Sequence, residues 1–295
     1  MKVLCFGALN IDYTYTVDHF VQKGETLSSK SLQVFSGGKG LNQTVALARA
    51  GAEVYHAGAV GTDGGFLLQL MEEAGANIEN VAVLDEVRTG NAIIQKDKNG
   101  DNCIILYGGA NQAITKAQVD RTLQKFERED FIVLQNEINE LAYIMEKAHE
   151  IGMKIILNPS PMDEKIPKLP LQYVSYFLLN EIETLQLLQS DDTDDIDGER
   201  LARKLLEKFP TAAIVLTLGE KGSVYMDQKE KVSQPIYKVK TVDTTAAGDT
   251  FTGFFIAGLL KSGSVKEAMD LAAKASAIAV SRPGAAPSIP VLAEI

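Results

Sequence analysis

The segment VDTTAAGDTFTGFF, residues 242–255, places small residues and a carboxylate directly before an apolar run with helical character. Three consecutive small residues precede the carboxylate: Ala246, Ala247 and Gly248. Their N–H groups can approach an anion closely, and the dipole of the helix expected over about 249–261 adds positive charge. Asp249 stands where it could accept a proton from a hydroxyl that approaches a bound phosphate. The segment predicts a phosphate or oxyanion cradle with a general base; the alternative is that Asp249 or Thr245 only caps the helix.

Two polar turns near the N-terminus could hold the hydroxyl groups of a sugar. In SGGKGLN, three glycines permit close approach of the backbone around Lys39, and Asn42 opens the next expected helix. In LNID, Asn10 and Asp12 lie two residues apart on one face, and a carboxylate can accept hydrogen bonds from two neighbouring hydroxyls. A glycine turn and a strand-end turn are the alternatives. The chain has neither GxxxxGK[ST] nor GxGxxG, so a P-loop and a dinucleotide fingerprint are excluded.

LNEIE ends an expected strand and begins a helix, with Asn180 and Glu183 three residues apart on one helix face. This pair could organise the water shell of Mg²⁺. The same spacing fits a capping box, with Asn at the N-cap and Glu at N3, and both interpretations stay open. The acidic run 190–199 is interpreted as a solvated loop with an N-cap. No role is assigned to the three histidines, which have no partner spacing: His19, His56 and His149.

Amphipathic helices followed by glycine and then by an apolar run recur along the chain. Glycines stand where the left-handed residue after a helix belongs, at Gly51, Gly75 and Gly152. Apolar strands are expected at 131–135, 174–180 and 211–219. Helices that alternate with apolar strands predict an α/β fold, in which a mostly parallel sheet is covered on both faces. Ligands bind such sheets at the carboxyl ends of the strands, where the polar motifs fall.

Two stretches interrupt this rhythm, at 12–38 and 89–111. Both alternate Tyr, Thr, Val or Ile with polar residues, and KNGD in the second is a hairpin-turn sequence. They predict antiparallel strands outside the main sheet. A small sheet of this kind could lie over the large one as a lid and offer an exposed edge to a second subunit.

Composition limits the partners of the chain. The 295 residues are 45% apolar and 23% charged, with a formal net charge of −10 and a pI near 4.9, which argues against nucleic acid and anionic membranes. No apolar run approaches the roughly 18 residues of a membrane span. The start, MKVLCFGALNID, turns polar too early for a signal peptide, so a cytoplasmic location is expected. Cys5 and Cys103 are expected to be reduced, buried thiols, although a disulfide between them stays open.

Together these motifs resemble the ribokinase-like sugar kinase family, essentially end to end. The segments that carry the resemblance are GGKGLNQTVALARAGA, GDNCIILYGGANQAIT, VDTTAAGDTFTGFF and AIAVSRPGAAPSIP. The resemblance implies a single doubly wound α/β kinase domain over 1–295, with lid strands at approximately 12–36 and 89–108 through which the chain forms a homodimer. It also implies transfer of the γ-phosphate of ATP to the terminal hydroxyl of a pentose, D-ribose giving D-ribose 5-phosphate.

The resemblance assigns roles to individual positions of this sequence. It implies that Asp249 is the catalytic base and that Gly248, with Ala246 and Ala247, forms the anion hole. The implied sugar-binding residues are Asn10, Asp12, Gly38, Lys39, Asn42, Glu137 and Asp249. The implied ATP-binding residues are Asn180, Thr217, Gly219, Gly222, Gly248 and Ala273. Asn180 and Glu183 would organise Mg²⁺ through water. An activating K⁺ would be coordinated at Asp243, Thr245, Ala279, Arg282, Gly284 and Ser288, at several of them through backbone carbonyls.

Other functions stay open at this point. A kinase of the same fold could act on another sugar, a sugar acid or a nucleoside. A non-catalytic sugar-binding protein is also α/β, but it has no reason to place a carboxylate in an anion cradle. A dinucleotide oxidoreductase is disfavoured because GxGxxG is absent. ADP release with a panel of sugars and nucleosides discriminates among these functions.

Overall fold

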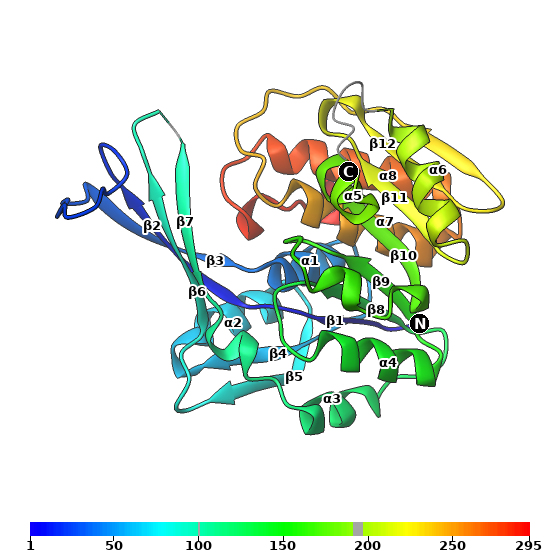
Figure 1. Ribbon diagram of the computed structural model, residues 1–295, viewed down its shortest axis with the longest axis horizontal. Coiled ribbons are helices and arrows are strands. Elements are labelled where there is room, and N and C mark those ends of the chain that lie inside the picture. The colour runs from blue at the N-terminus through cyan, green and yellow to red at the C-terminus, as the bar shows by residue number, and fades with distance from the viewer. Residues whose placement is uncertain (100, 191–196) are drawn as a thin grey trace.

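The structure is a computed structural model that describes residues 1–99, 101–190 and 197–295. Within these residues, nine strands form one large sheet in the order β13-β12-β11-β10-β9-β8-β1-β4-β5 (Figure 1). The strands are β1 (Val3–Phe6), β4 (Val54–Gly61), β5 (Asn77–Leu84), β8 (Phe131–Gln135), β9 (Lys154–Asn158), β10 (Val174–Asn180), β11 (Ala213–Thr217), β12 (Ser223–Met226) and β13 (Lys231–Gln234). Strands β11 through β5 pair in parallel, whereas β12 and β13 join antiparallel at one edge. The predicted mostly parallel sheet is confirmed.

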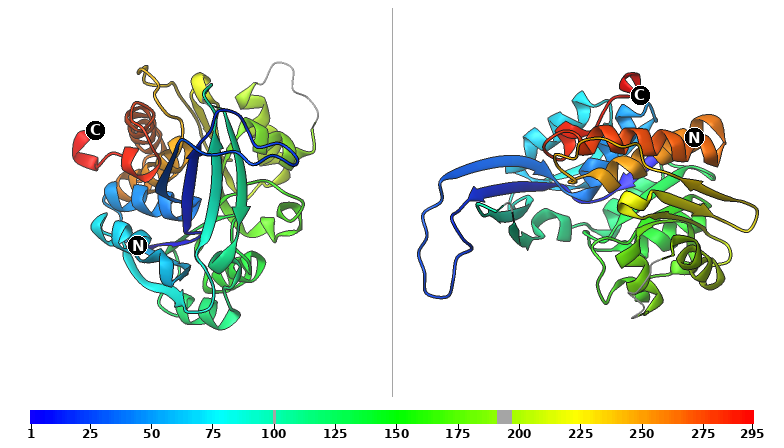
Figure 2. Two further views of the ribbon diagram at one scale, coloured as in Figure 1. Left: turned by 90° about the vertical axis from the view of Figure 1, so that its left-hand side faces the viewer. Right: turned by 90° about the horizontal axis from the view of Figure 1, so that it is seen from above.

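Eight α-helices in the described ranges cover both faces of this sheet (Figure 2). They are α1 (Lys39–Arg49), α2 (Gly65–Glu73), α3 (Lys116–Leu123), α4 (Leu141–Ile151), α5 (Glu181–Leu188), α6 (Gly198–Lys208), α7 (Ala247–Ser262) and α8 (Val265–Val280). Helices α1, α2, α7 and α8 pack on one face, and α3 to α6 on the other. The fold is therefore doubly wound, as expected. None of the helices that the structure describes combines the length and the apolarity of a membrane span.

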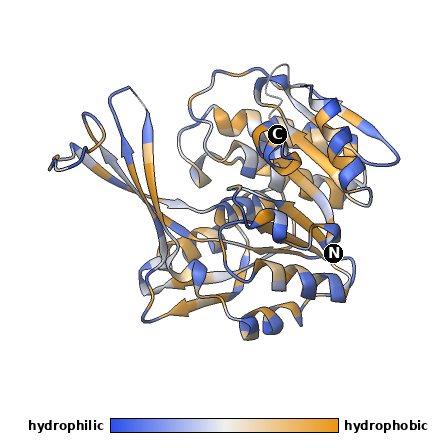
Figure 3. Ribbon diagram, in the orientation of Figure 1, coloured by the Kyte–Doolittle hydropathy of each residue, from blue (hydrophilic) through white to orange (hydrophobic). Residues whose placement is uncertain are grey.

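The two cores arise because successive side chains of a strand point to opposite faces of the sheet. In β1, Leu4 and Phe6 enter the core beneath α3 to α6, while Val3 and Cys5 enter the core beneath α1, α2, α7 and α8. A strand that is buried on both faces must be apolar at every position, so the central strands are hydrophobic along their length (Figure 3). The glycines predicted after helices have φ values of 86°, 97° and 91° at Gly51, Gly75 and Gly152.

A second sheet, here called the lid sheet, projects away from the large sheet beyond the carboxyl end of β1 (Figures 1 and 2). Its order is β3-β2-β6-β7, with β2 (Asn10–Thr16), β3 (Ser31–Gly37), β6 (Gly90–Lys96) and β7 (Asn102–Tyr107). The prediction that its strands are antiparallel is wrong for the central pair, because β2 and β6 pair in parallel. Strand β2 follows β1 and β6 follows β5, and both enter the lid sheet from strands of one parallel sheet.

Several local predictions can be compared with the described residues. The KNGD turn includes residue 100, which lies outside them; beside it, Asp97 accepts hydrogen bonds from the N–H groups of Asn99 (2.8 Å) and Asp101 (3.0 Å). Most of the acidic run, 191–196, also lies outside them, and Asp197 caps α6 as expected. Cys5 and Cys103 are both free, and the burial predicted for Cys103 is wrong because every residue of edge strand β7 is exposed.

Candidate active site

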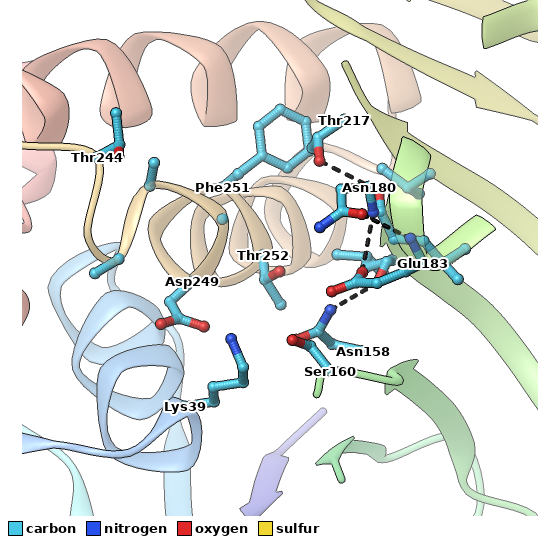
Figure 4. A pocket seen from close by; sticks show the side chains of 16 residues that line it. Lys39, Asn158, Ser160, Asn180, Glu183, Thr217, Thr244, Asp249, Phe251 and Thr252 are labelled. Atoms are coloured by element: carbon cyan, nitrogen blue, oxygen red, sulfur yellow. Dashed lines mark hydrogen bonds between the residues drawn. The ribbon is translucent and has the colours of Figure 1, made fainter. Parts of the chain in front are cut away.

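A pocket of about 240 Å³ opens where the carboxyl ends of β9, β10 and β11 face the start of α7 (Figure 4). Polar side chains that line it are Lys39, Asn158, Ser160, Asn180, Glu183, Thr217, Thr244, Asp249 and Thr252. Ala246, Ala247 and Gly248 also line it. Because the strands run in parallel, the residues that follow them gather at one edge of the sheet. The pocket lies at the edge where the sequence predicted a ligand site.

The expected cradle forms the first turn of α7, which begins two residues earlier than predicted. Ala246 precedes the helix with a φ of 60°, in the left-handed region that residues with a Cβ rarely adopt. The first helical bond in this turn runs from the Thr250 N–H to the Ala246 carbonyl, at 2.8 Å. The N–H groups of Gly248 and Asp249 precede that bond and have no carbonyl partner within the helix. Gly248 is exposed, and a Cβ added there would meet no atom within 4 Å beyond its own helical surroundings. A ligand atom can therefore approach this backbone closely.

Asp249 is buried, with 7% of its surface exposed, and two side-chain amides hold it. Its Oδ2 accepts a hydrogen bond from Asn42 Nδ2 at 3.1 Å, and its Oδ1 accepts one from Gln43 Nε2 at 2.9 Å. The alternative that Asp249 or Thr245 caps α7 is wrong, because the residue at the N-cap is Ala246 and no side chain caps the helix. The Asp249 carboxylate instead faces the N-terminal turns of α1 and the pocket.

Helix α1 brings Lys39 and Asn42 to the same region. The helix begins at Lys39, so the expectation that Asn42 opens it is wrong by three residues. Gly38, with φ 94°, precedes it, and a Cβ there would lie 2.6 Å from the Ala8 carbonyl oxygen. The Lys39 N–H donates to Glu137 Oε2 at 2.8 Å. Figure 4 shows the Lys39 side chain directed toward the part of the pocket that holds the Asp249 carboxylate.

Asn10 and Asp12 lie at the base of the lid sheet, on β2, beside this cluster. Asn10 Oδ1 accepts a hydrogen bond from Asn111 Nδ2 at 2.7 Å, which fixes the orientation of the Asn10 amide. Burial raises the pKa of Asp12 to about 7, and the negative charge of Glu137 adds to this rise. Burial also raises the pKa of Glu137, although the charge and N–H group of Lys39 oppose the rise. The two carboxyl groups are thus electrostatically coupled.

Glycines flank Asn10 on both neighbouring strands. In the register of the lid sheet, Asn10 lies opposite Gly37 on β3 and Gly90 on β6. A Cβ at Gly37 would lie 2.2 Å from Asp12 Oδ2, and a Cβ at Gly90 would lie 2.1 Å from Asn111 Nδ2. The polar side chains occupy the space that side chains at these two positions would need.

Asn180 and Glu183 form the capping box that the sequence left as one of two interpretations. The Glu183 N–H donates to Asn180 Oδ1 (2.8 Å), and the Asn180 N–H donates to Glu183 Oε2 (3.0 Å). Both residues nevertheless line the pocket, opposite Lys39 and Asp249 (Figure 4). Thr217 lies beside Asn180 in the register of β10 and β11, and its hydroxyl donates to the Leu179 carbonyl at 3.2 Å. The capping role therefore coexists with a position in the pocket.

Three predicted nucleotide-binding positions lie outside the lining of this pocket. Gly219 begins a 3-10 turn after β11 with φ 54°, and Gly222 ends it with φ 91°. A Cβ at Gly222 would lie 2.3 Å from the Gln234 carbonyl oxygen. Ala273 lies on α8, one turn before Ser276, whose hydroxyl donates to the Ala247 carbonyl at 3.1 Å. Ala273 therefore belongs to the helix that packs against the cradle.

The two segments predicted to hold a monovalent cation meet beside the cradle. Asp243 Oδ1 accepts hydrogen bonds from the Thr245 N–H (2.9 Å) and hydroxyl (2.6 Å), and Asp243 Oδ2 accepts one from the Gly284 N–H (3.0 Å). Ala279 lies in the last turn of α8, and its carbonyl accepts the Arg282 N–H at 3.1 Å. The Arg282 guanidinium pairs with Glu294 at 2.6 Å, which leaves its carbonyl as the group that could coordinate. Ser288 is fully buried.

The motifs of the sequence do not reveal the buried side-chain amides that contact Asp249 and Asn10. Gln43 and Gln135 are fully buried, and Asn111 is 1% exposed. Asn111 holds the backbone of Leu9 at both ends, accepting from its N–H (3.0 Å) and donating to its carbonyl (3.2 Å). The available signal for Gln43 was the run of uncharged residues from Gly40 to Ala48, which is typical of a buried helix. A polar residue there must find a partner inside the protein.

No group of three or more His, Cys, Asp or Glu side chains suited to a metal ion occurs in the ranges that the structure describes.

Comparison with known proteins defines the class. A family model described as pfkB family carbohydrate kinase matches residues 1–292. A ribokinase of Staphylococcus aureus (strain COL) is 34% identical over 302 residues, covering 100% of this chain and 98% of its own length. A deoxyribokinase of Salmonella typhi is 31% identical, with 98% and 96% covered. The solved structure of Arabidopsis thaliana ribokinase complexed with ribose and ATP has a TM-score of 0.87 and 27% identity, with 99% and 96% covered.

The fold and these likenesses define a phosphotransferase with the ribokinase-like fold. The chain belongs to the pfkB family of carbohydrate kinases. The alternatives of a non-catalytic sugar-binding protein and a dinucleotide oxidoreductase are thereby set aside.

Proposed function

We propose that this chain transfers the γ-phosphate of ATP to the terminal hydroxyl of a pentose, and that D-ribose is its best acceptor. The observation that carries the proposal is the Asp249 carboxylate, buried at the first turn of α7 between the cradle and Lys39. A carboxylate in that position can take the proton of a sugar hydroxyl as the hydroxyl attacks a phosphate held by the cradle. The names of the Staphylococcus relative and the Arabidopsis complex support ribose and ATP as the substrates.

The sugar would lie between the base of the lid sheet and α1. Asn10 would donate to a hydroxyl oxygen, and ionised Asp12 would accept hydrogen bonds from two neighbouring hydroxyls. Gly38, Lys39, Asn42 and Glu137 would complete the sugar-binding residues. Closure of the lid sheet would exclude water, which otherwise competes with the sugar as phosphoryl acceptor.

The nucleotide would extend from the cradle toward β10 and β11. The unpaired N–H groups at the start of α7 would stabilise charge that develops on the phosphoryl oxygens. Asn180, Thr217 and Gly248 line this part of the pocket, and Gly219, Gly222 and Ala273 would lie around the base and ribose of the nucleotide.

The donors around Asn180 fit a magnesium ion that arrives with ATP. Asn158, Asn180 and Glu183 offer amide and carboxylate oxygens, the ligand type that Mg²⁺ prefers, and the capping box uses one Glu183 oxygen, Oε2. Asn180 and Glu183 would hold the ion through its water shell. When bound, the ion supplies charge neutralisation on the phosphates.

The loops beside the cradle fit a large monovalent cation such as K⁺. Asp243 accepts hydrogen bonds from the N–H groups of Thr245 and Gly284, which joins the segment 243–245 to the loop that follows α8. Asp243, Thr245, Ala279, Arg282, Gly284 and Ser288 would supply them, several through the backbone. A cation at this position would fix the geometry of the loop before α7 without contact with the substrate.

We also propose that the chain forms a homodimer through the lid sheet. Leu32, Val34, Ile93 and Ile105 lie on one face of that sheet according to its register. They are 50%, 50%, 39% and 60% exposed. An apolar sheet face of this kind is stabilised when a second copy covers it. Since ATP is a cytoplasmic metabolite, we place the enzyme in the cytoplasm.

The test is steady-state ADP release with Mg·ATP and K⁺ across a panel of acceptors. D-Ribose should give the highest kcat/KM. A site that forms hydrogen bonds with a buried substrate hydroxyl disfavours a substrate without that hydroxyl by orders of magnitude. 2-Deoxy-D-ribose is the second candidate, since one relative of this chain is a deoxyribokinase. A tenfold preference for fructose, a sugar acid or a nucleoside would refute the assignment of ribose and retain the kinase class.

A further inference from the structure

Behind Asp249 lies a row of buried amides that is separate from the pocket lining. Gln43 donates from Nε2 to Asp249 Oδ1 at 2.9 Å and to Asn158 Oδ1 at 3.3 Å. Gln43 Oε1 accepts a hydrogen bond from Gln135 Nε2 at 2.6 Å. Gln43 and Gln135 are fully buried, and neither lines the pocket. Gln43 therefore contacts the proposed base from its protein side and does not touch substrate.

The Gln43 amide can be satisfied in one orientation only. Its Nε2 has two acceptors, the Asp249 carboxylate and Asn158 Oδ1, and its Oε1 has one donor, Gln135. Rotation of the amide by 180° would set an oxygen against the carboxylate of Asp249 and a nitrogen against the nitrogen of Gln135, so three hydrogen bonds would be lost. The NH₂ group of Gln43, which is the positive end of its amide dipole, is therefore held against the Asp249 carboxylate.

Gln135 is the last residue of β8 and completes this row. A Cβ at Gly7 would lie 2.2 Å from Gln135 Oε1, so Gly7 leaves the room that the amide occupies. Gln135 Oε1 is buried without a hydrogen-bond partner in the described structure. Gln43 Oε1 holds the Gln135 Nε2 at 2.6 Å and Cys5 Sγ contacts it at 3.6 Å, so the amide keeps this orientation although its oxygen stays unpaired.

We propose that Gln43, oriented by Gln135 and Asn158, is a positioning residue that holds the Asp249 carboxylate in the direction required for proton acceptance. Asn42 and Gln43 each bind one oxygen, so together they prevent rotation of the carboxyl group. A misplacement of about 1 Å at a reacting group can lower a rate by about 10²-fold. This inference rests on the proposed role of Asp249 as base.

The test compares Gln43→Met with Asp249→Asn and with the double variant, using D-ribose, saturating Mg·ATP and K⁺. Methionine keeps the length of glutamine and removes its hydrogen bonds. We expect kcat to fall at least tenfold while KM for D-ribose stays within about twofold. Gln43→Met should cause no further loss in the Asp249→Asn background, because a residue that only positions the base has nothing left to position. A purely structural defect would lower activity in both backgrounds.

Gln118→Met is the matched control. Gln118 is a buried glutamine on α3, on the other face of the large sheet, and its Nε2 donates to the Gly58 carbonyl at 2.7 Å. This variant should melt earlier than wild type and keep its kcat. Gln135→Met is the second variant if Gln43→Met does not fold; it removes the support of Gln43 and should lower kcat, again without effect in the Asp249→Asn background.

Three results would overturn the inference: a folded Gln43→Met variant with more than a tenth of wild-type kcat, losses that add to those of Asp249→Asn, or an equal loss in Gln118→Met. If Asp249→Asn itself keeps more than a tenth of wild-type kcat, the role of the base is refuted and the inference with it. If Asp249→Asn is inactive and Gln43→Met is not, the inference alone fails.

Discussion

Acidification from pH 8 to pH 6 should lower kcat/KM for D-ribose about tenfold, with Asp12 as the titrating group. Burial, with a smaller contribution from Glu137, raises the pKa of Asp12 to about 7. With that pKa, about nine tenths of the Asp12 carboxyl groups are ionised at pH 8 and about one tenth at pH 6. The ionised carboxylate can accept hydrogen bonds on both oxygens, whereas the protonated form cannot. The kcat/KM for D-ribose should therefore be proportional to the fraction of free enzyme in which Asp12 is ionised.

The assay is kcat/KM for D-ribose between about pH 5.5 and pH 9, at saturating Mg·ATP and K⁺. Asp12→Asn should have a lower kcat/KM that no longer rises through pH 7, since the amide does not titrate. The same scan of kcat/KM for ATP at saturating ribose controls for titration of the nucleotide. A flat wild-type profile between pH 6 and pH 8 would refute the reasoning. An unchanged slope in Asp12→Asn would assign the titration to Glu137, whose pKa is also raised by burial.

The same pKa shift predicts how stability depends on pH. The ordinary pKa of an aspartate is 3.8, so between about pH 4 and pH 7 the folded protein holds a proton on Asp12 that the unfolded chain releases. The stabilisation from this proton is full below about pH 4 and is lost as the pH rises through 7. Urea denaturation at pH 5 and pH 8 should show a smaller pH dependence in Asp12→Asn than in wild type. An identical dependence in both proteins would argue against a raised pKa at Asp12.

Asp249→Asn should lower kcat by ~10²–10⁴-fold, the usual cost of losing a general base, with little change in KM for D-ribose; a variant that melts like wild type and keeps more than a tenth of kcat would mean that another group takes the proton. Replacement of K⁺ by Na⁺ or Tris at fixed Mg²⁺ should lower the rate, because the loops that the Gly284 N–H joins to Asp243 are proposed to coordinate a large monovalent cation; equal rates in all three buffers would remove the cation site. Light scattering should detect a particle of twice 32.0 kDa that Val34→Lys with Ile105→Lys dissociates, and a wild-type monomer at micromolar concentration would contradict the lid interface.

Much of the fold could be predicted from sequence because local pattern and burial agree there. The strands at 131–135 and 174–180 have the predicted bounds, since each is an apolar run flanked by polar residues and buried in a two-faced sheet. The parallel pairing of β2 with β6 could not be predicted. It depends on where the two strands leave the large sheet, and alternation along a strand carries no information about its partner.

The residues of the candidate site also fall into two groups, those that the sequence predicts and those that it does not. Asp249, Lys39 and Asn42 stand in short motifs whose glycines and charges are visible in one segment, and the structure brings them together. Gln43 and Gln135 meet across 92 residues of sequence, and each alone resembles an ordinary polar residue. The burial of Cys103 was predicted wrongly because an apolar strand at the exposed edge of a projecting sheet has the same residue types as a strand in a core.

The glycines on either side of Asn10 restrict the order in which this site can change during evolution. A single substitution at Gly37 or Gly90 brings a side-chain carbon within 2.2 Å of Asp12 Oδ2 or 2.1 Å of Asn111 Nδ2, so it displaces a polar residue before it creates a contact of its own. A change at Asn10 or Asp12 leaves both glycines acceptable. Lineages that acquire a different acceptor should therefore replace Asp12 before Gly37, whereas a Cβ at Gly90 would also lie 2.9 Å from the Gly108 carbonyl oxygen, so that position stays closed to a side chain.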